Sequence, residues 1–324
     1  MVFLTQRRRA CLALCIAGAA LAAITAPALA QDAWKPTKPI RIIVPFAPGG
    51  GGDVAARLVA PPLGNQLGQT IVVENKAGAS GSIASDYVYR AAPDGYTLLV
   101  ATADSQIMYP QIAKVSFDTT KYVPIGGITT IGYVLMGRPD LPATLPELLA
   151  LMKTQKLSYA SGGAGSALHV LTEMFAGATK TEMLHVPFQG AGPGLQALLG
   201  GQVDLMMVPM ATAGQYRGKL RAYGISSAQR HDAMKDVPTL SEQGVAVAGD
   251  SWISLVAPPG TPLPVVESVS RALHEAVNTP EMQKKWTEMG MTAIGSSREE
   301  FGKFYLAEYR KWGNVIRAAN IRVD

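Results

Sequence analysis

The fold is decided by the stretch IRIIVPFAPGGGGD at Ile40–Asp53, in which a strand, a glycine-rich loop and the start of a helix follow one another. Residues 40–46 are mostly β-branched and predict a buried strand. Residues 54–67 carry apolar side chains at helical spacing and predict a helix. Such units build mainly parallel sheets, which bind ligands where their strands end and their helices begin.

The same pattern occurs in two strand–helix–strand–helix–strand units. The first is predicted to have strands at 40–46, 70–74 and 97–101 and helices at 54–67 and 82–92. The second is predicted to have strands at 156–160, 183–187 and 203–207 and helices at 166–178 and 194–199. We therefore expect two lobes, connected by extended segments at 122–138, 220–226 and 252–257.

The end of the chain is predicted to be helical. Thr279 can cap a helix with Pro280 in its first turn, and Ser297 with Glu300 forms a capping box for a helix that runs to about Arg317. At helical spacing, an apolar stripe is expected to pack on a lobe rather than to bind a ligand. This stripe comprises Phe301, Phe304, Tyr305, Tyr309, Trp312 and Ile316.

The first thirty residues have the order of a secretory signal peptide. Arg7–Arg9 are followed by an apolar stretch at 10–24 and by the small-residue site Ala28–Ala30, so we expect cleavage after Ala30 and a periplasmic protein. The apolar stretch is shorter than the ~20 residues of a membrane span. Ordinary secretion and twin-arginine export both stay open, because the arginines are adjacent.

Composition excludes several classes of function. The chain has 324 residues, 48% hydrophobic and 16% charged, which is typical of a two-domain globular protein. Both cysteines, Cys11 and Cys15, lie in the signal, and its removal leaves 26 basic and 24 acidic residues, without the basic face that nucleic acid or lipid requires. The four histidines lack zinc-site spacing, so no metal and no cofactor is predicted.

Two glycine-rich loops are the candidate site. The loop at Pro45–Asp53 follows the first strand, and the loop at Ala160–Ser166 has the same place in the second unit. Exposed N–H groups at a helix start favour an anion, and we expect the loops to face each other across a cleft. Neither loop matches a P-loop, a dinucleotide fingerprint or a nucleophile elbow. The pattern therefore favours capture of a small anion without catalysis.

Several motifs in one order resemble the Bug family, the extracytoplasmic receptors of tripartite tricarboxylate transporters. The resemblance covers nearly the whole chain after the signal. It is carried by Pro45–Gly50 with Asp53, and by the motifs at 74–81, 92–99, 158–163, 200–204 and 236–240.

The resemblance implies a type II, Venus-flytrap periplasmic binding protein: two α/β lobes, each with a mixed, mainly parallel sheet flanked by helices. It implies lobes at 31–128 plus 227–324 and at 129–226, with crossings near 126–131 and 220–254. It also implies a receptor that is not an enzyme, that holds a small carboxylate without a cofactor, and that delivers it to membrane permease subunits; we expect a monomer. Position by position, the family pattern places ligand-binding residues at Phe46, Ala47, Gly49, Gly50 and Asp53 in one loop and at Ser161, Gly165, Ser166 and His169 in the other.

Some of these residues have two interpretations. Asp53 can cap or pin its loop rather than contact the ligand, and His169 can donate to the ligand or tie its helix to a strand. Gln189 lies in a segment that lines the cleft in the family. Asp204 can meet the ligand or serve as a structural partner of backbone N–H groups.

The chain departs from the common family pattern at 101–110, where a small polar loop and Asn-Pro are usual. Here Asp104 is acidic, and Tyr109 precedes the proline. An acid near an anion site is costly unless it meets a donor. We therefore hypothesise that Asp104, with Thr102 and Ser105, contacts the end of the ligand opposite the captured carboxylate.

Two other functions stay open. One is a sensory subunit that docks on a signalling partner instead of a permease, and the other is an exported α/β hydrolase. The sequence leaves the ligand open among dicarboxylates, tricarboxylates, amino acids and aromatic acids.

Overall fold

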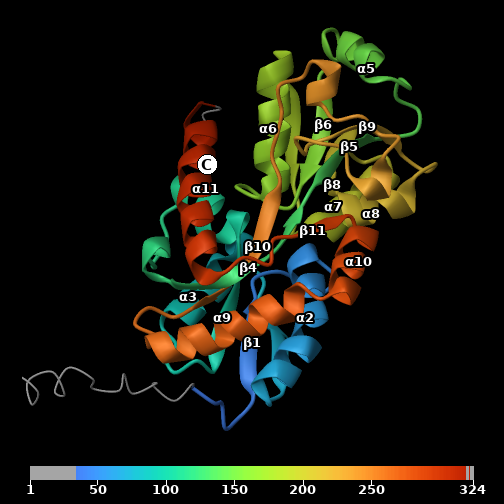
Figure 1. The fold of residues 1–324 in the computed structure, drawn as a ribbon. Coiled ribbons are helices and arrows are strands. Elements are labelled where there is room, and N and C mark those ends of the chain that lie inside the picture. Colours follow the sequence, from blue (N-terminus) through green and yellow to red (C-terminus); the bar gives the residue numbers. More distant parts are fainter. Residues whose placement is uncertain (1–33, 319–320, 322–324) are drawn as a thin grey trace, which may run out of the picture. The chain divides into compact units, whose positions relative to one another are not determined.

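The first lobe is built on a six-stranded sheet in the order β11-β4-β10-β3-β1-β2 (Figure 1). The computed structural model describes residues 34–318 and residue 321, so the predicted signal peptide lies outside it. Strands β1, β2 and β3 are parallel, and β10 runs antiparallel to β3 and β4. The strands span Ile40–Val44 (β1), Ile71–Asn75 (β2), Thr97–Thr102 (β3), Val123–Ile131 (β4), Ser251–Ala257 (β10) and Met291–Ala293 (β11).

The second lobe has a five-stranded sheet in the order β7-β6-β8-β5-β9. Strand β6 is parallel to β7 and β8, whereas β5 is antiparallel to β8 and β9. The predicted architecture of two mixed sheets is therefore confirmed. The strands span Tyr133–Gly137 (β5), Leu157–Ser161 (β6), Met183–Pro187 (β7), Leu205–Pro209 (β8) and Arg221–Ile225 (β9).

The chain passes between the sheets twice. It leaves the first sheet after Ile131 and enters the second at Tyr133, and it returns between Ile225 and Ser251. Residues 129–131, which the predicted limits assign to the second lobe, pair with β10 and β11 of the first sheet. The exact lobe limits stay a prediction.

Helices cover both sheets because their buried residues recur at helical spacing. In α9, for example, Val266, Val269, Leu273 and Val277 are buried. The helices span Gly51–Leu67 (α2), Ser82–Tyr89 (α3), Tyr109–Ile112 (α4), Leu145–Met152 (α5), Ala167–Thr179 (α6), Ala191–Leu199 (α7), Met210–Ala213 (α8), Leu263–Val277 (α9), Pro280–Glu288 (α10) and Arg298–Ala318 (α11). No helix among the described residues combines the length and the apolar character that crossing a membrane requires.

The predicted helix starts near the end of the chain are confirmed. Thr279 Oγ1 accepts a hydrogen bond from Met282 N at 3.2 Å. The Ser297–Glu300 box is complete, with its two backbone contacts at 2.9 and 3.3 Å. Most of the apolar stripe of α11 packs as expected, and Phe301 and Tyr305 meet Trp252 edge-on at 5.6 and 5.7 Å. Tyr309, which was also assigned to the stripe, is exposed.

Helix α2 begins earlier than the sequence predicts. Gly51 and Gly52 already belong to its first turn, so the glycine-rich loop is shorter than expected. Glycine has a low helix propensity, which placed the predicted start at residue 54. A Cβ at Gly51 would lie 2.5 Å from Ile131 Cδ1, so a larger residue there would require the end of this side chain to move.

Candidate functional site

The first loop, residues 45–50, joins the carboxyl end of β1 to α2. Asp53 in the first turn of α2 accepts hydrogen bonds from Gly49 N at 2.9 Å, Arg57 Nε at 3.0 Å and Asn75 Nδ2 at 2.9 Å. Asn75 also donates to Phe46 O at 3.0 Å. The carboxylate of Asp53 thus pins the loop from behind.

The ionisation of Asp53 follows from these contacts. Burial acts to raise the pKa of Asp53, but hydrogen bonds from Arg57, Gly49 and Asn75 outweigh it and hold the pKa below its usual value. The loop itself is open, since Ala47 and Gly49 are exposed and Phe46 and Gly50 are half-buried. Main-chain groups of the loop are therefore accessible to a ligand.

The second loop, residues 161–166, joins the carboxyl end of β6 to α6. Ser166 is the N-cap of α6, because its Oγ accepts from His169 N at 3.3 Å. The same hydroxyl donates to Gly163 O at 2.7 Å, and Gly165 N donates to His169 Nδ1 at 3.1 Å. These bonds fold the loop onto the first turn of α6.

His169 lies in a stack of rings beneath this loop. Its ring is 4.1 Å from that of His185, which is 4.9 Å from that of Tyr159. Burial lowers the pKa of both histidines to about 4, so both are neutral near pH 7. Since Gly165 N–H donates to Nδ1 of His169, the ring proton of His169 lies on Nε2. This geometry fits the interpretation of His169 as a structural tie.

Ser161 contacts the same stack. Its Oγ lies 2.6 Å from His185 Nε2 and accepts from Gly163 N at 3.1 Å. A serine beside a histidine resembles a nucleophile and its base, but a triad also needs an acid that orients the histidine. Within residues 34–318, no carboxylate hydrogen-bonds to His185. His185 was not among the predicted site residues. Side chains along β7 alternate between the two faces of the sheet, and this alternation could have placed His185 on the face below α6.

The segment at 101–110, where the chain departs from the common family pattern, forms a π-helical turn at Asp104–Met108 that runs directly into α4. Thr102 Oγ1 and Ser105 Oγ lie 3.2 Å apart, and Ser105 N donates to Thr102 Oγ1 at 3.2 Å. Both side chains are buried. They bond to each other at the end of β3.

Asp104 crosses from the first lobe to the second. Its Oδ1 accepts a short hydrogen bond from Ala167 N at the start of α6, and its Oδ2 lies 3.2 Å from Ser251 Oγ on β10. Burial raises the pKa of Asp104, against the opposing effect of these hydrogen bonds. The carboxyl group thus has two protein partners, and its contact with a ligand end stays a prediction.

Two further contacts join the lobes at the same place. Ser80 Oγ donates to Ala164 O of the second loop at 2.9 Å. Gly165 packs against α4, where a Cβ would lie 2.6 Å from Ile112 Cδ1 and 3.3 Å from Tyr109 Cα. Sequence reasoning assigned no role to Ser80, although it lies in the motif at 74–81. The structure therefore brings the second loop together with the segments after β2 and β3.

Gln189 and Asp204 have different positions. Gln189 is exposed, and its neighbour Gly190 lies 3.5 Å from the position that a Cβ on Gly162 would take, so this segment borders the second loop. Asp204 precedes β8, where its Oδ2 accepts from Ser158 N at 2.7 Å and its Oδ1 pairs with Arg138 at 2.9 Å. Because Ser158 lies near the start of β6, Asp204 is at the opposite end of the strands from the second loop.

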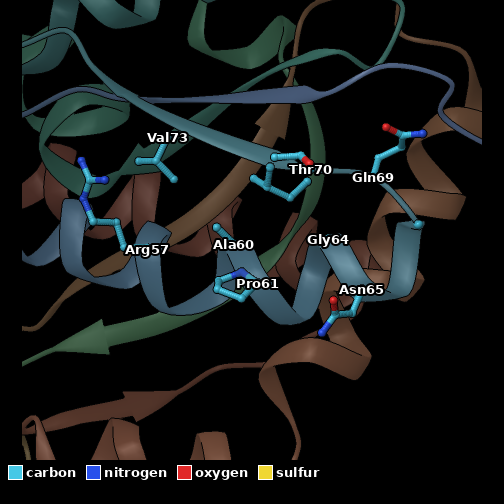
Figure 2. A pocket seen from close by; sticks show the side chains of 10 residues that line it. Arg57, Ala60, Pro61, Gly64, Asn65, Gln69, Thr70 and Val73 are labelled. Carbon is cyan, nitrogen blue, oxygen red and sulfur yellow. The ribbon is translucent and has the colours of Figure 1, made fainter.

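A separate groove of about 730 Å³ lies between α2 and β2 (Figure 2). Figure 2 shows Arg57, Pro61 and Asn65 of α2 on one side and Val73 of β2 on the other. None of the predicted ligand-binding residues lines it. The candidate site is therefore assigned from the two loops and not from this groove.

Comparisons with known proteins identify the family and the fold of the chain. The family model for the tripartite tricarboxylate transporter family receptor matches residues 55–321. Protein BugT of Bordetella pertussis is 33% identical over 316 residues, which are 94% of this chain and 95% of BugT. The structure of the periplasmic binding protein BugD is 31% identical and covers 89% of this chain and 99% of BugD, with a TM-score of 0.82. MatC from Rhodopseudomonas palustris, solved with bound malate, is 31% identical over 87% of this chain and 99% of MatC, with a TM-score of 0.81.

Proposed function

Because the chain belongs to the tripartite tricarboxylate transporter receptor family, we propose that it captures a small carboxylate between its lobes and delivers it to the membrane permease of such a transporter. The fold is that of periplasmic binding proteins such as BugD. The malate bound to MatC supports a carboxylate as the class of ligand. Export of this chain by a signal peptide cleaved after Ala30, and action as a monomer without catalysis, belong to the same proposal.

The observation that supports the proposal is that each lobe has a donor-rich loop at the carboxyl end of a parallel strand, and that the second loop contacts the first lobe. Each loop opens a helix, and the Ser80–Ala164 contact holds the second loop against the first lobe. The first N–H groups of a helix lack partners within the helix and favour an anion. Neutral donors and bridging water can hold a carboxylate at modest desolvation cost.

We assign the ligand to the main-chain groups of the first loop and to those of the second. Asp53 and His169 act behind these loops as structural supports, and Asp204 supports the far end of the second sheet. Thr102 and Ser105 form the floor after β3. The proposed contact residues are Phe46, Ala47, Gly49, Gly50, Ser161, Gly165, Ser166 and Gln189.

Thermal unfolding of residues 31–324 tests the proposal. Malate, adipate, citrate, benzoate and glutamate would be compared, with ATP and glucose as controls. A ligand at 100 times its Kd stabilises the folded state by about 2.7 kcal/mol, which is a clear shift in Tm. We expect a shift with one class of carboxylate and recovery of that compound unchanged. No shift with any acid would refute carboxylate capture, and recovery of an altered compound would favour the hydrolase, for which the Ser161–His185 contact is the starting point.

A further inference from the structure

The contacts of Asp104 span three segments that belong to different parts of the fold. The residue lies in the turn after β3, its Oδ1 bonds Ala167 N of α6, and its Oδ2 lies 3.2 Å from Ser251 Oγ of β10. The first and third segments belong to the first lobe, whereas α6 belongs to the second. The side chain therefore joins the lobes directly, and separation of the lobes would break its bond to α6.

Asp104 makes this contact without a cation. The residue is only 7% exposed, and no lysine, arginine or histidine of residues 34–318 forms an ion pair with it. A carboxylate buried in this way loses its hydration, so burial favours the protonated form. As a neutral acid, the group would accept from Ala167 N through one oxygen and donate to Ser251 Oγ through the other.

We infer that Asp104 is a positioning residue whose carboxyl group, bonded to Ala167 N and beside Ser251 Oγ, holds the second loop against the first lobe in the closed arrangement. Its bond to Ala167 adjoins Ser166 and Gly165, so it fixes the segment that we propose to contact the ligand. A chain that closes without a ligand has its binding-competent state already populated, which raises the apparent affinity. Because burial raises the pKa of Asp104, a lower pH should favour closure.

Other titratable groups on neighbouring elements could add to a pH effect, so the measurement must isolate Asp104. Asp250 and Tyr133 have raised pKa values because of burial, and the pKa of His169 is lowered for the same reason. Comparison with D104N removes their shared contribution. The titratable groups on the elements around Asp104 are Tyr133 on β5, His169 on α6, Asp250 before β10, Tyr305 on α11, Asp86 on α3 and Tyr109 on α4.

The test uses residues 31–324, which contain no cysteine because Cys11 and Cys15 precede them. Exposed Lys153 on the second lobe and exposed Glu275 on the first would be changed to cysteine and spin-labelled. The distance between the labels, measured by pulsed EPR without ligand, reports closure. The variants are D104A, which removes both contacts, and D104N, which can accept from Ala167 N and donate to Ser251 Oγ like the neutral acid.

Two more variants control for general effects. Asp118 caps a short helical turn within the first lobe by accepting a hydrogen bond from Thr120 N at 2.9 Å. D118A therefore removes an aspartate whose capping contact lies within one lobe. If D104A does not fold, S251A weakens the same link from β10 without touching α6. Circular dichroism checks the fold of each variant.

We expect a longer label distance in D104A than in the wild type, D104N and D118A. The open fraction of the wild type should rise with pH more steeply than that of D104N, which keeps the contribution of the other titratable groups. The inference is refuted if D104A keeps the wild-type distance, or if D104N opens as D104A does.

Affinity for malate provides the second readout, and this arm alone rests on the proposed function. Malate should bind D104A about three- to tenfold more weakly than the wild type, as loss of one buried hydrogen bond predicts, and D104N within about twofold of the wild type. Tighter binding by D104A would overturn the inference, because Asp104 would then compete with the ligand. If the wild type binds neither malate nor any other acid of the panel, the proposed function fails, and the label distances still decide on Asp104.

Discussion

Gly165→Ala should weaken ligand binding, because its Cβ would hinder closure of the two lobes. Gly165 has φ +73°, and a Cβ there would lie 2.6 Å from Ile112 Cδ1 and 3.3 Å from Tyr109 Cα. The left-handed conformation costs an alanine roughly 1–2 kcal/mol in any setting. The contact with α4 adds about 1–3 kcal/mol, as overpacking does, but only while the lobes are closed. The overpacking cost therefore lowers ligand affinity, because the ligand binds between closed lobes.

Gly68→Ala is the matched control. Gly68 has a similar φ of +67°, but a Cβ there has no atom within 4 Å. Both variants should lose similar stability in urea unfolding, whereas only Gly165→Ala should lose affinity for the carboxylate that stabilises the wild type, by about 5- to 150-fold in calorimetry. Equal affinities of Gly165→Ala, Gly68→Ala and the wild type would refute the closed packing of the second loop on α4.

Three other predictions follow from the site. Asp53→Asn should lower the unfolding free energy by about 1–3 kcal/mol at pH 7, because the charged hydrogen bond from Arg57 is lost. Since the pKa of Asp53 in the folded state is depressed, the difference in unfolding free energy between the variant and the wild type, measured in urea, should shrink as pH falls below about 4. Asp204→Ala should lower stability by a similar amount and leave carboxylate affinity unchanged, and a large loss of affinity would contradict its structural role. His169 and His185 have folded pKa values near 4, below the unfolded value, so stability should fall as pH drops from about 6.5 to 4, and a flat urea profile over that range would contradict their burial.

Local patterns were sufficient to predict most of the fold. Strands β1, β2, β3, β6 and β7 lie within two residues of their predicted bounds because short runs of mostly apolar, β-branched or aromatic residues are bounded by turn residues. Helices α10 and α11 were found from their caps. Helix α5 was missed although Thr144 and Glu147 form a capping box, a signal that the sequence contains. Helix α9 was also missed, although Pro264 in its first turn is a helix-start signal; its valines weaken the helical propensity that packing on α2 restores.

The site was predicted only in part, because its contacts link segments far apart in the sequence. The two loops could be located from glycines that follow strands, and the pinning of the first loop by Asp53 could be anticipated as an alternative. The partner of Asp104 could not, since Ala167 N is a main-chain group 63 residues away. The same holds for Ser80, whose partner Ala164 O is 84 residues away.

The hydrogen bonds of the serine hydroxyl groups in the second loop explain why the sequence does not identify the ligand. Ser166 Oγ is engaged by His169 N and Gly163 O, and Ser161 Oγ by Gly163 N and the ring of His185. The side chains of the second loop thus stabilise the loop, and the N–H groups of Gly163, Gly165 and Ala167 have protein partners as well. We therefore propose that the ligand is held by other main-chain groups and by water. Such donors are the same for every residue type, so selectivity must come from the shape of the closed site. Substitutions that alter how the second loop packs on α4 should therefore change the choice of ligand more than substitutions of the serines.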